Sequence, residues 1–420
     1  GLMEAAKKDG PGDAAPPPEV RRPAVLGAGV MGGGIAQLIA DKTGLPVRVR
    51  DIQPAALSTA LKHAAALFAR QVQRRRLQPA EMRRRMALLQ PTMEDGGLAG
   101  SDFVLEAVVE DLTVKQRLFA DLSRHLAPTA ILATNTSSLS IDDIGQLASR
   151  RERVVGMHFF NPVGKMPLVE VIAGSLTGES AVRTATAFAR RLGKTPVIVR
   201  DGPGFLVNRL LAFYSAEAMW LLDEGHRVEA IDRALVDWGM PMGPLRLADE
   251  VGLDVSAKVG HILHEAFPDR LLFPDWIDRI AEDKGRLGVK SGKGIYRYKD
   301  GREQEADPAI YAVLNLTPAA GLAPPEPERL ILPMVNEAAR CLAEGIVDGP
   351  GALDLALVFG IGFPPFRGGL CRWADSEGLD TLVQGLEALA AEHGPRHTPS
   401  AALRQFAARG GFYSAASTAT

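Results

Sequence analysis

The stretch AVLGAGVMGGGIAQLIA, residues 24–40, decides the fold of the first part of the chain. A short apolar run leads directly into glycines spaced G-x-G-x-x-G, as Gly27, Gly29 and Gly32, and then into a helical pattern. In a strand–turn–helix unit these glycines permit the tight turn, the approach of a pyrophosphate and the packing of helix on strand. The helix N-terminus, at Val30 and Met31, would face the phosphates. The stretch predicts a dinucleotide site, although an ordinary strand–helix turn can carry the same glycines.

A carboxylate follows at the spacing that such a site requires. The next strand pattern, VRVRD, ends in Asp51, nineteen residues after Gly32. An acid at this place can accept hydrogen bonds from the adenosine ribose, and it would repel the additional phosphate of NADP. We therefore predict NAD as the cofactor.

Alternating strand and helix patterns extend from Arg22 to Asp201. Short apolar runs alternate with amphipathic segments, which predicts a parallel, doubly wound Rossmann-type α/β sheet. The segment 54–89 is long for one crossover, and Gln78-Pro79 should end one helix and begin another. The expected strands are AVLG, VRVRD, FVLEAV, AILATN, RVVGMHF, LVEVIAG and PVIVRD.

After Asp201 the strand patterns stop and two similar helical regions follow. Residues 208–225 align with 328–345 at one constant offset, matching Arg209 with Arg329 and Glu217 with Glu337. Two further matches occur in the same order, which indicates a duplicated all-α domain. The expected division is a linker or tail at 1–20, the NAD-binding domain at 21–201, a first helical copy at 202–300, a linker at 301–325 and a second copy at 326–420.

Composition restricts the class of protein. Hydrophobic residues make up 46% and charged residues 23% of the 420, and the net charge is −2, as in ordinary soluble proteins with two or three domains. The two cysteines, in no metal-like spacing, fit a reducing compartment. No segment resembles a membrane span or a signal peptide, so a cytoplasmic location is expected. A start on Gly-Leu rather than Met suggests a processed or cloned fragment.

A histidine and a glutamate lie twelve positions apart in GMHFFNPVGKMPLVEVI, residues 156–172. Read as two short strands, the segment would bring His158 against Glu170. A carboxylate fixes the tautomer of an imidazole and raises its basicity, which suits a general base beside a nicotinamide. A satisfied polar pair in a core is the alternative. Other polar residues expected around this sheet edge and the following helix are Glu110, the run Asn135 to Ser138 that contains Ser137, Asn161 and Asn208.

Six motifs in order resemble the L-3-hydroxyacyl-CoA dehydrogenase family. They cover about residues 20–410, and the duplicated helical region makes the resemblance closest to the dehydrogenase portion of multifunctional fatty-acid oxidation proteins (alpha subunit). Those proteins carry an N-terminal hydratase domain, for which this chain has only a linker, so no hydratase activity is expected. The motifs are GAGVMGGGIA, EAVVEDLTVKQRLFADL, TNTSSLSI, HFFNPVGKMPLVEVI, DGPGFLVNRLL and GMPMGPLRLADEVGLD.

The resemblance implies roles for individual residues. His158 would be the base and Glu170 its orienting partner, with Ser137 and Asn208 around the substrate oxygens. Glu110, Lys115, Asn135 and Asn161 would lie around the NAD ribose and nicotinamide, and Lys293 would be a further cofactor-side residue. An acyl-CoA substrate follows, and no metal-ligand spacing is present.

A run of seven arginines occupies the long crossover, with Glu81 as the one acid among them. Such runs are usually solvated helix faces. The alternative is a clamp on the phosphates of coenzyme A, because guanidinium binds phosphate bidentately. A nucleic-acid site is not expected, since the run contains no aromatic residues. The arginines are Arg70, Arg74, Arg75, Arg76, Arg83, Arg84 and Arg85.

Two other functions remain open at this point. One is an NAD-dependent dehydrogenase of a free hydroxy acid, which would not depend on coenzyme A. The other is a largely structural subunit, in which the helical regions bind a thiolase subunit or form a homodimer. The second helical copy has Glu328 where the first has Asn208, which favours a covering role for that copy.

Overall fold

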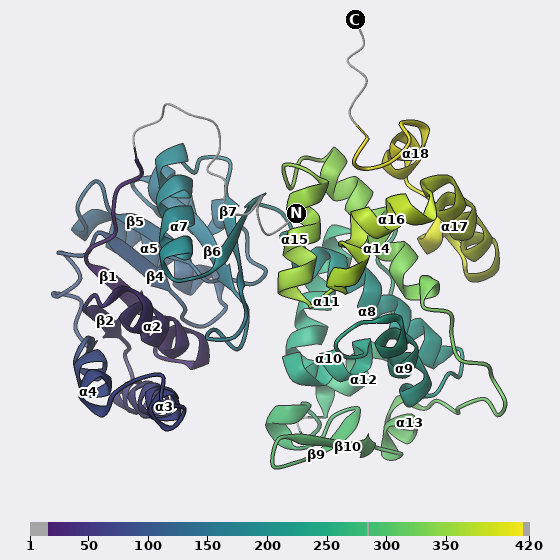
Figure 1. The fold of residues 1–420 in the computed structure, drawn as a ribbon, viewed down its shortest axis with the longest axis horizontal. Coiled ribbons are helices and arrows are strands. Elements are labelled where there is room, and N and C mark those ends of the chain that lie inside the picture. The colour runs from purple at the N-terminus through teal and green to yellow at the C-terminus, as the bar shows by residue number, and fades with distance from the viewer. Residues whose placement is uncertain (1–15, 284, 415–420) are drawn as a thin grey trace, which may run out of the picture. The chain divides into compact units, whose positions relative to one another are not determined.

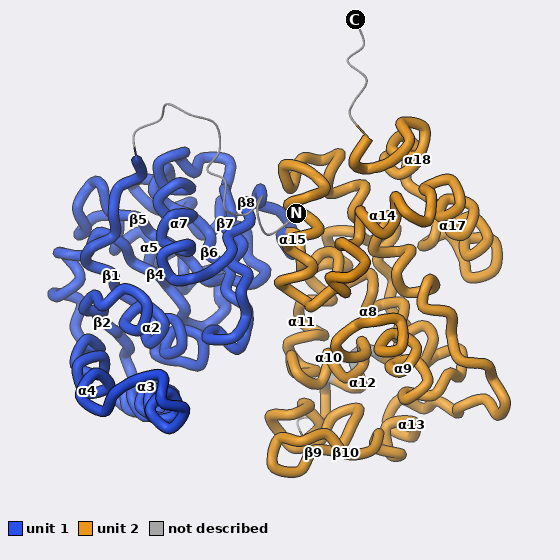
Figure 2. The backbone as a smooth tube through the Cα atoms, in the orientation of Figure 1, with its two compact units in different colours: residues 1–205 blue, residues 206–420 orange. Residues whose placement is uncertain are grey.

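The structure, a computed structural model, describes residues 16–283 and 285–414 of the chain. The chain is divided into two compact units, with the boundary between Phe205 and Leu206 (Figure 2). Residues 16–20 belong to no helix or strand, and the rest of the predicted N-terminal tail lies outside the described residues. Each unit is considered by itself below.

The first unit is built on an eight-stranded sheet in the order β3-β2-β1-β4-β5-β6-β7-β8 (Figure 1). Strands β1 to β6 are parallel to one another, which confirms the predicted doubly wound arrangement for this part. Strand β7 is antiparallel to β6, and β8 is parallel to β7, so the last two strands are reversed. The strands are β1 Pro23–Leu26, β2 Val47–Arg50, β3 Leu89–Thr92, β4 Phe103–Glu106, β5 Ile131–Thr134, β6 Val154–Phe159, β7 Leu168–Ala173 and β8 Thr195–Arg200.

Helices bury both faces of this sheet. Alternate strand residues such as Val25 and Phe103 share one core with Ile35 and Phe188 from the helices α2 and α7. Strand residues of the opposite parity, such as Leu26, are buried as well, so the second face is also covered. The predicted helix start at Pro79 is confirmed, because α4 begins there, but the preceding helix α3 already ends at Gln73. The helices are α2 Val30–Thr43, α3 Pro54–Gln73, α4 Pro79–Ala87, α5 Leu112–His125, α6 Ile141–Ile144 and α7 Glu179–Arg191.

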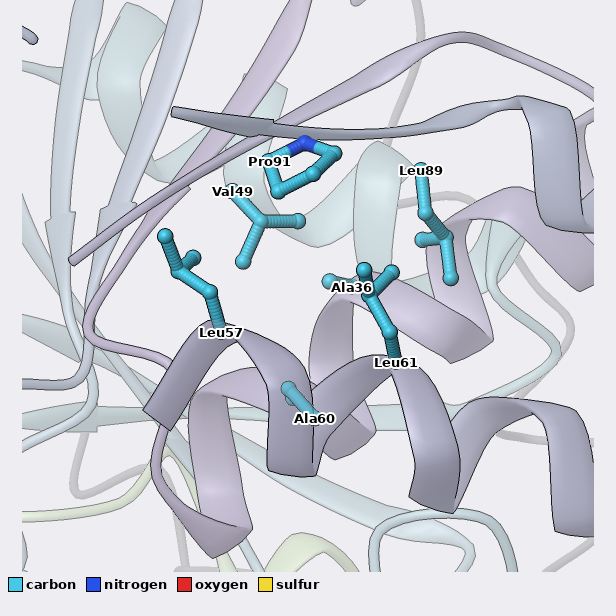
Figure 3. A pocket seen from close by; sticks show the side chains of 8 residues that line it. Ala36, Val49, Leu57, Ala60, Leu61, Leu89 and Pro91 are labelled. Carbon is cyan, nitrogen blue, oxygen red and sulfur yellow. The ribbon is translucent and has the colours of Figure 1, made fainter. Parts of the chain in front are cut away.

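A small apolar pocket lies among α2, α3, β2 and β3 (Figure 3). Its volume, about 10 Å³, is at the lower limit for a single water molecule, and its walls are almost entirely carbon. It is therefore a packing gap and not a substrate site. It is lined by Gly33, Ala36, Val49, Leu57, Ala60, Leu61, Leu89 and Pro91.

The second unit is mainly helical, with one small hairpin. The expectation that strands stop after Asp201 is wrong, because β9 (Tyr296–Lys299) and β10 (Arg302–Ala306) pair antiparallel around a turn at Asp300-Gly301. Strand β10 and helix α13 also fall inside the segment 301–325 that the sequence indicated as a linker. The helices are α8 Val207–Asp223, α9 Val228–Trp238, α10 Pro244–Val251, α11 Leu253–Ala266, α12 Ile277–Glu282, α13 Ala309–Leu314, α14 Glu328–Ala343, α15 Pro350–Gly360, α16 Leu370–Glu377, α17 Leu379–His393 and α18 Ala401–Ala408.

The aligned helices α8 and α14 pack against each other through reciprocal ion pairs. In one direction Arg209 donates to Glu337 and Glu344, each at 2.7 Å. In the other, Arg329 donates to Glu217 and Glu224, each at 2.6 Å. Equivalent residues thus exchange partners, as across a two-fold axis between identical subunits.

Each copy also buries one aspartate in the same manner. Asp232 accepts hydrogen bonds from the backbone N–H groups of Leu245 and Arg246 and from a tyrosine hydroxyl. Asp354 accepts the same three kinds of bond from Cys371, Arg372 and Tyr413. This repeated buried network supports the duplication seen in the sequence.

Candidate functional site

The glycine turn has the geometry that the sequence predicts. Gly27 has φ +91°, and a Cβ there would lie 2.4 Å from the carbonyl oxygen of Ala107. A Cβ on Gly32 would lie 1.9 Å from the carbonyl oxygen of Gly27. Gly29 differs, because nothing lies within 4 Å of the place where its Cβ would be. Two glycines are thus required by the protein itself, whereas the third leaves open space that fits a cofactor.

That open space lies at the start of α2. Gly29 is the N-cap of the helix and provides no side-chain cap, so backbone N–H groups of the first turn are available to a ligand. Val30 and Met31 form the first turn, and Val30 is 76% exposed. An anionic pyrophosphate is the group that such a helix start binds most readily.

Asp51 follows β2 and holds the glycine turn in place. Its carboxylate accepts hydrogen bonds from the backbone N–H of Ala28 at 2.7 Å and of Gln53 at 2.8 Å. The residue is half-buried. A carboxylate has about four acceptor sites, so these two bonds leave capacity for a ribose hydroxyl.

A buried charge network connects the ends of β4 and β5. Lys115 is 1% exposed, and its ammonium lies 2.6 Å from Glu106 and 3.2 Å from Glu110. Glu106 also accepts a hydrogen bond from the hydroxyl of Thr134 at 2.7 Å. The predicted Lys115 is therefore enclosed between two carboxylates. Its contribution to the site is the ion pair with Glu110. Glu106 was not predicted, because its contribution depends on packing between strands.

Glu110 holds the loop that follows β5. It accepts hydrogen bonds from the hydroxyl of Thr136 and from the backbone N–H of Ser137, at 2.5 and 3.0 Å. Burial alone would raise the pKa of this carboxyl, but Lys115 and these hydrogen bonds together lower it below the ordinary value. The nearby Asn135 accepts a bond from the backbone N–H of Phe159 at 2.9 Å, which ties the same loop to the end of β6.

His158 and Glu170 form the pair that the sequence predicts. They are directly opposite in the antiparallel register of β6 and β7, with 2.7 Å between Nδ1 and Oε2. His158 is 6% exposed and Glu170 is fully buried. Because a carboxylate can only accept, Nδ1 carries the proton and Nε2 is left as the basic nitrogen. The rings of Phe160 and Phe205 lie 4.5 and 5.9 Å from the imidazole, which makes its surroundings apolar.

Comparison with known proteins places this arrangement in one family. Residues 22–202 match the 3-hydroxyacyl-CoA dehydrogenase, NAD binding domain, and residues 204–298 and 327–417 match the 3-hydroxyacyl-CoA dehydrogenase, C-terminal domain. A 3-hydroxybutyryl-CoA dehydrogenase from Escherichia coli K12 superposes with a TM-score of 0.81 at 30% identity, over 93% of this chain and 99% of that one. The chain belongs to the 3-hydroxyacyl-CoA dehydrogenase family. It contains the family's NAD-binding domain and two copies of the family's C-terminal domain.

Other relatives include longer proteins. The fatty acid oxidation complex subunit alpha of Shewanella amazonensis is 45% identical over 97% of this chain, which covers 58% of that protein. FadB2 of M. tuberculosis has a TM-score of 0.64 at 38% identity, covering 67% of this chain and all of that one. The chain therefore spans less than two thirds of the length of the Shewanella protein and the whole length of FadB2.

Three further residues were predicted for the dehydrogenase site. Asn161 follows β6 and is exposed. Asn208 is half-buried near the start of α8, and Lys293 lies before β9, 4.0 Å from Asp307. The last two belong to the second unit, so the structure describes them separately from the dyad.

Four exposed apolar side chains lie at the carboxyl edge of the sheet. Only one of them, Val30, was predicted from the sequence to belong to the site. Each follows one of four neighbouring strands, β2, β1, β4 and β3. A large apolar residue within four positions of a strand end was the available signal. They are Val30, Ile52, Met93 and Val109, which are 76%, 68%, 52% and 66% exposed.

The arginine run extends over the end of α3 and over α4. Arg85 pairs with Asp41 and Glu81. The other six arginines are exposed, and none of them forms an ion pair with another described residue. Their charge is therefore available to an anionic ligand.

The described residues form neither a metal-binding cluster nor a membrane-spanning helix. Among the described residues, no three His, Cys, Asp or Glu side chains come together in a way that could hold a metal ion. No helix within residues 16–283 and 285–414 is both long and apolar enough to cross a membrane. Cys341 and Cys371 are buried and unbridged.

Proposed function

We propose that this chain oxidises the 3-hydroxyl group of an L-3-hydroxyacyl-CoA to the 3-ketone with NAD, and catalyses the reverse reduction. The observation that carries the proposal is the buried His158–Glu170 pair at the end of an NAD-binding sheet. Family membership supports the same substrate class. When bound, NAD⁺ accepts the hydride that leaves the substrate carbon.

The protein's part in the reaction is to move one proton and stabilise the resulting charge. Nε2 of His158 takes the proton of the hydroxyl, and Glu170 stabilises the imidazolium through its bond to Nδ1. Phe160 and Phe205 keep the surroundings of the imidazole apolar, which strengthens this interaction. In the reverse direction the imidazolium returns the proton to the developing alkoxide.

The remaining predicted residues would bind the reactants. Ser137 and Asn208 are proposed to contact the 3-oxygen and thioester region of the substrate. Around the cofactor we propose a ribose contact for Asp51 and an adenine surface formed by the exposed apolar residues named above. Other cofactor contacts are proposed for Gly27, Gly29, Val30, Met31, Gly32, Glu110, Lys115, Asn135, Asn161 and Lys293.

The exposed arginines are proposed to bind the phosphates of coenzyme A. Six guanidinium groups without a carboxylate partner among the described residues favour this over a solvated face held by internal ion pairs. The same feature favours an acyl-CoA over a free hydroxy acid, which has no phosphate.

A place in fatty-acid oxidation is the wider proposal. It rests on the longer relatives named as subunits of a fatty acid oxidation complex. The unbridged cysteines accord with a cytoplasmic location. The reciprocal contacts of α8 and α14 suggest that the second helical copy covers the first as a subunit would. Either a thiolase subunit or a second copy of the chain is then the expected external partner.

Substrate specificity can be tested directly. Acetoacetyl-CoA and longer 3-ketoacyl-CoA esters are supplied with NADH or NADPH, and the loss of nicotinamide absorbance is followed. We expect turnover with NADH and much less with NADPH. Free 3-hydroxybutyrate with NAD⁺ is the control: turnover equal to that of its CoA ester would favour the free-acid alternative. No turnover of any CoA ester would favour a structural subunit.

A further inference from the structure

Lys194 buries a positive charge beside the turn that connects the strands of the dyad. It lies between α7 and β8 and is 9% exposed. Its Nζ donates hydrogen bonds to the carbonyl oxygens of Val163 and Met166, at 2.5 and 2.6 Å. Among the described residues no carboxylate lies at ion-pair distance from this ammonium.

Residues 160–167, the dyad turn, are held from three sides. Within the turn, the N–H of Met166 donates to the carbonyl of Pro162 at 3.0 Å. From β8, the N–H of Thr195 donates to the carbonyl of Pro167 at 2.8 Å. Val163 packs against α2, since a Cβ on Gly34 would lie 3.2 Å from its side chain. The dyad turn is thus clamped between Lys194 and the helix that begins at the glycine turn.

A buried ammonium is a costly way to hold a turn if packing alone is needed. An unpaired buried charge is normally avoided, and an apolar side chain fills such a space at less cost. What the ammonium adds is two charge-assisted bonds to specific carbonyl oxygens, which are stronger and more directional than neutral ones. The turn that it holds follows His158 by one residue and contains Asn161.

We propose that Lys194 is a positioning residue for the dehydrogenase reaction, acting through the dyad turn to fix the places of His158 and Asn161. This rests on the proposed function. The protonated form is the active one, because loss of the proton removes the positive charge that strengthens both bonds. The rate should then respond to the titration of Lys194.

The surroundings of Lys194 place its titration in a pH range in which enzyme rates can be measured. Burial, with a contribution from the positive charge of Lys42 on α2, lowers the pKa of Lys194 to about 8. Further cations on the packed elements are Lys165 on the dyad turn and Arg190 and Arg191 at the end of α7. The acids of these elements have other partners: Asp41 on α2 pairs with Arg85, and Glu179 on α7 lies 3.9 Å from Arg183. Arg191 is itself paired with Glu19 at 3.2 Å, so that carboxylate does not compensate Lys194.

The direction of the pH dependence distinguishes a loss of catalytic rate from unfolding. A lysine whose pKa is lowered in the folded state binds fewer protons there than in the unfolded chain, so its contribution to stability rises as the pH increases from about 8. A loss of rate in the same range would therefore come from the site and not from denaturation. In the oxidation direction His158 is the proton acceptor, so a loss of rate at higher pH does not come from this residue.

The test is the pH dependence of kcat for 3-hydroxybutyryl-CoA oxidation by the whole chain. The wild type should lose rate with a midpoint near pH 8. Lys194→Arg, which stays charged, should remove this alkaline limb, and Lys194→Met should lower kcat about ten- to a hundredfold below pH 8, without an alkaline limb and with little change in KM. Lys42→Met is the matched control: it should move the limb to higher pH and leave the plateau rate unchanged.

Two results would overturn the proposal. One is an alkaline limb that persists in Lys194→Arg; the other is a wild-type rate and limb in Lys194→Met. Amide hydrogen exchange provides a readout without turnover: at one fixed pH, residues 160–167 should exchange faster in Lys194→Met than in the wild type, and equal exchange would also count against it. If the wild type oxidises no CoA ester, the proposed function fails, while exchange still reports whether Lys194 holds the turn.

Discussion

His158 and Glu170 face each other across the antiparallel pair β6–β7, with Nδ1 and Oε2 2.7 Å apart. The antiparallel register places the two residues on the same face of the sheet, so the bond follows from strand pairing and not from a flexible loop. The reversal of β7 is thus the feature that converts a parallel NAD-binding sheet into a site with an oriented base.

Replacing either member of this pair should remove catalysis and preserve cofactor binding. For His158→Ala we expect kcat to fall about 10²- to 10⁴-fold, the usual contribution of a general base. Glu170→Gln keeps a hydrogen-bond acceptor but removes the charge that stabilises the imidazolium, so its kcat should also fall. Initial rates and NADH binding by fluorescence check both variants. Wild-type activity in His158→Ala would place the base elsewhere.

Two glycines of the turn, Gly29 and Gly32, should respond differently to alanine. At Gly29 the new methyl group enters open space, so we expect a weaker affinity for NAD and a melting temperature that is unchanged or slightly higher. At Gly32 it meets the carbonyl oxygen of Gly27, which should cost about 1–3 kcal/mol of stability. Gly96→Ala, where nothing lies within 4 Å, is the control. Normal NAD affinity in Gly29→Ala would argue against a cofactor at this helix start.

Most of the sheet could be predicted from the sequence because buried parallel strands are continuous apolar runs. Strand β3 could not, since Leu89–Thr92 contains a glutamine and Pro91 and lies at the sheet edge, where proline is tolerated. The β9–β10 hairpin was missed despite a signal. Asp300 and Gly301 both have positive φ, 51° and 72°, and Asp-Gly between alternating residues is typical of a hairpin turn.

In the site, residues that belong to a sequence motif could be predicted more easily than residues whose role depends on contacts with distant segments. Gly29, Asp51 and the dyad occupy positions that the strand ends determine. Glu106 and Lys194 have no motif of their own, because their partners come from segments 9 and 31 residues away along the chain. Such contacts depend on how helices pack on the sheet.

Removing exposed arginines should weaken the binding of coenzyme A esters selectively. We expect the double variants Arg74→Ala/Arg76→Ala and Arg83→Ala/Arg84→Ala to raise KM for acetoacetyl-CoA about tenfold, the effect of one lost charge-assisted bond. KM for an acetoacetyl-pantetheine, which lacks the nucleotide phosphates, should not change. Arg117→Ala/Arg124→Ala on α5 is the control for general charge. Equal changes for both substrates would favour a solvated face.

Because of the reciprocal ion pairs in the second unit, its free energy of unfolding should decrease at acidic pH. Burial would raise the pKa of Glu217, but His397, Arg396 and Arg329 outweigh it and lower that pKa from 4.5 to about 2. The stabilisation is therefore complete above pH 4.5 and is lost as the pH falls toward 2, about 3 kcal/mol in total.

Glu217→Gln tests this linkage. At pH 7 the variant should be about 3–5 kcal/mol less stable than the wild type, because Arg329 and Arg396 lose a buried partner. The difference should shrink as the pH is lowered through the range 4.5 to 2, because the wild-type carboxyl then becomes protonated as well. Urea denaturation at several pH values measures both effects, with Glu387→Gln, in an exposed pair with Arg404, as the control. A difference that stays constant with pH would show that Glu217 stabilises the α8–α14 contact through packing and not through its charge.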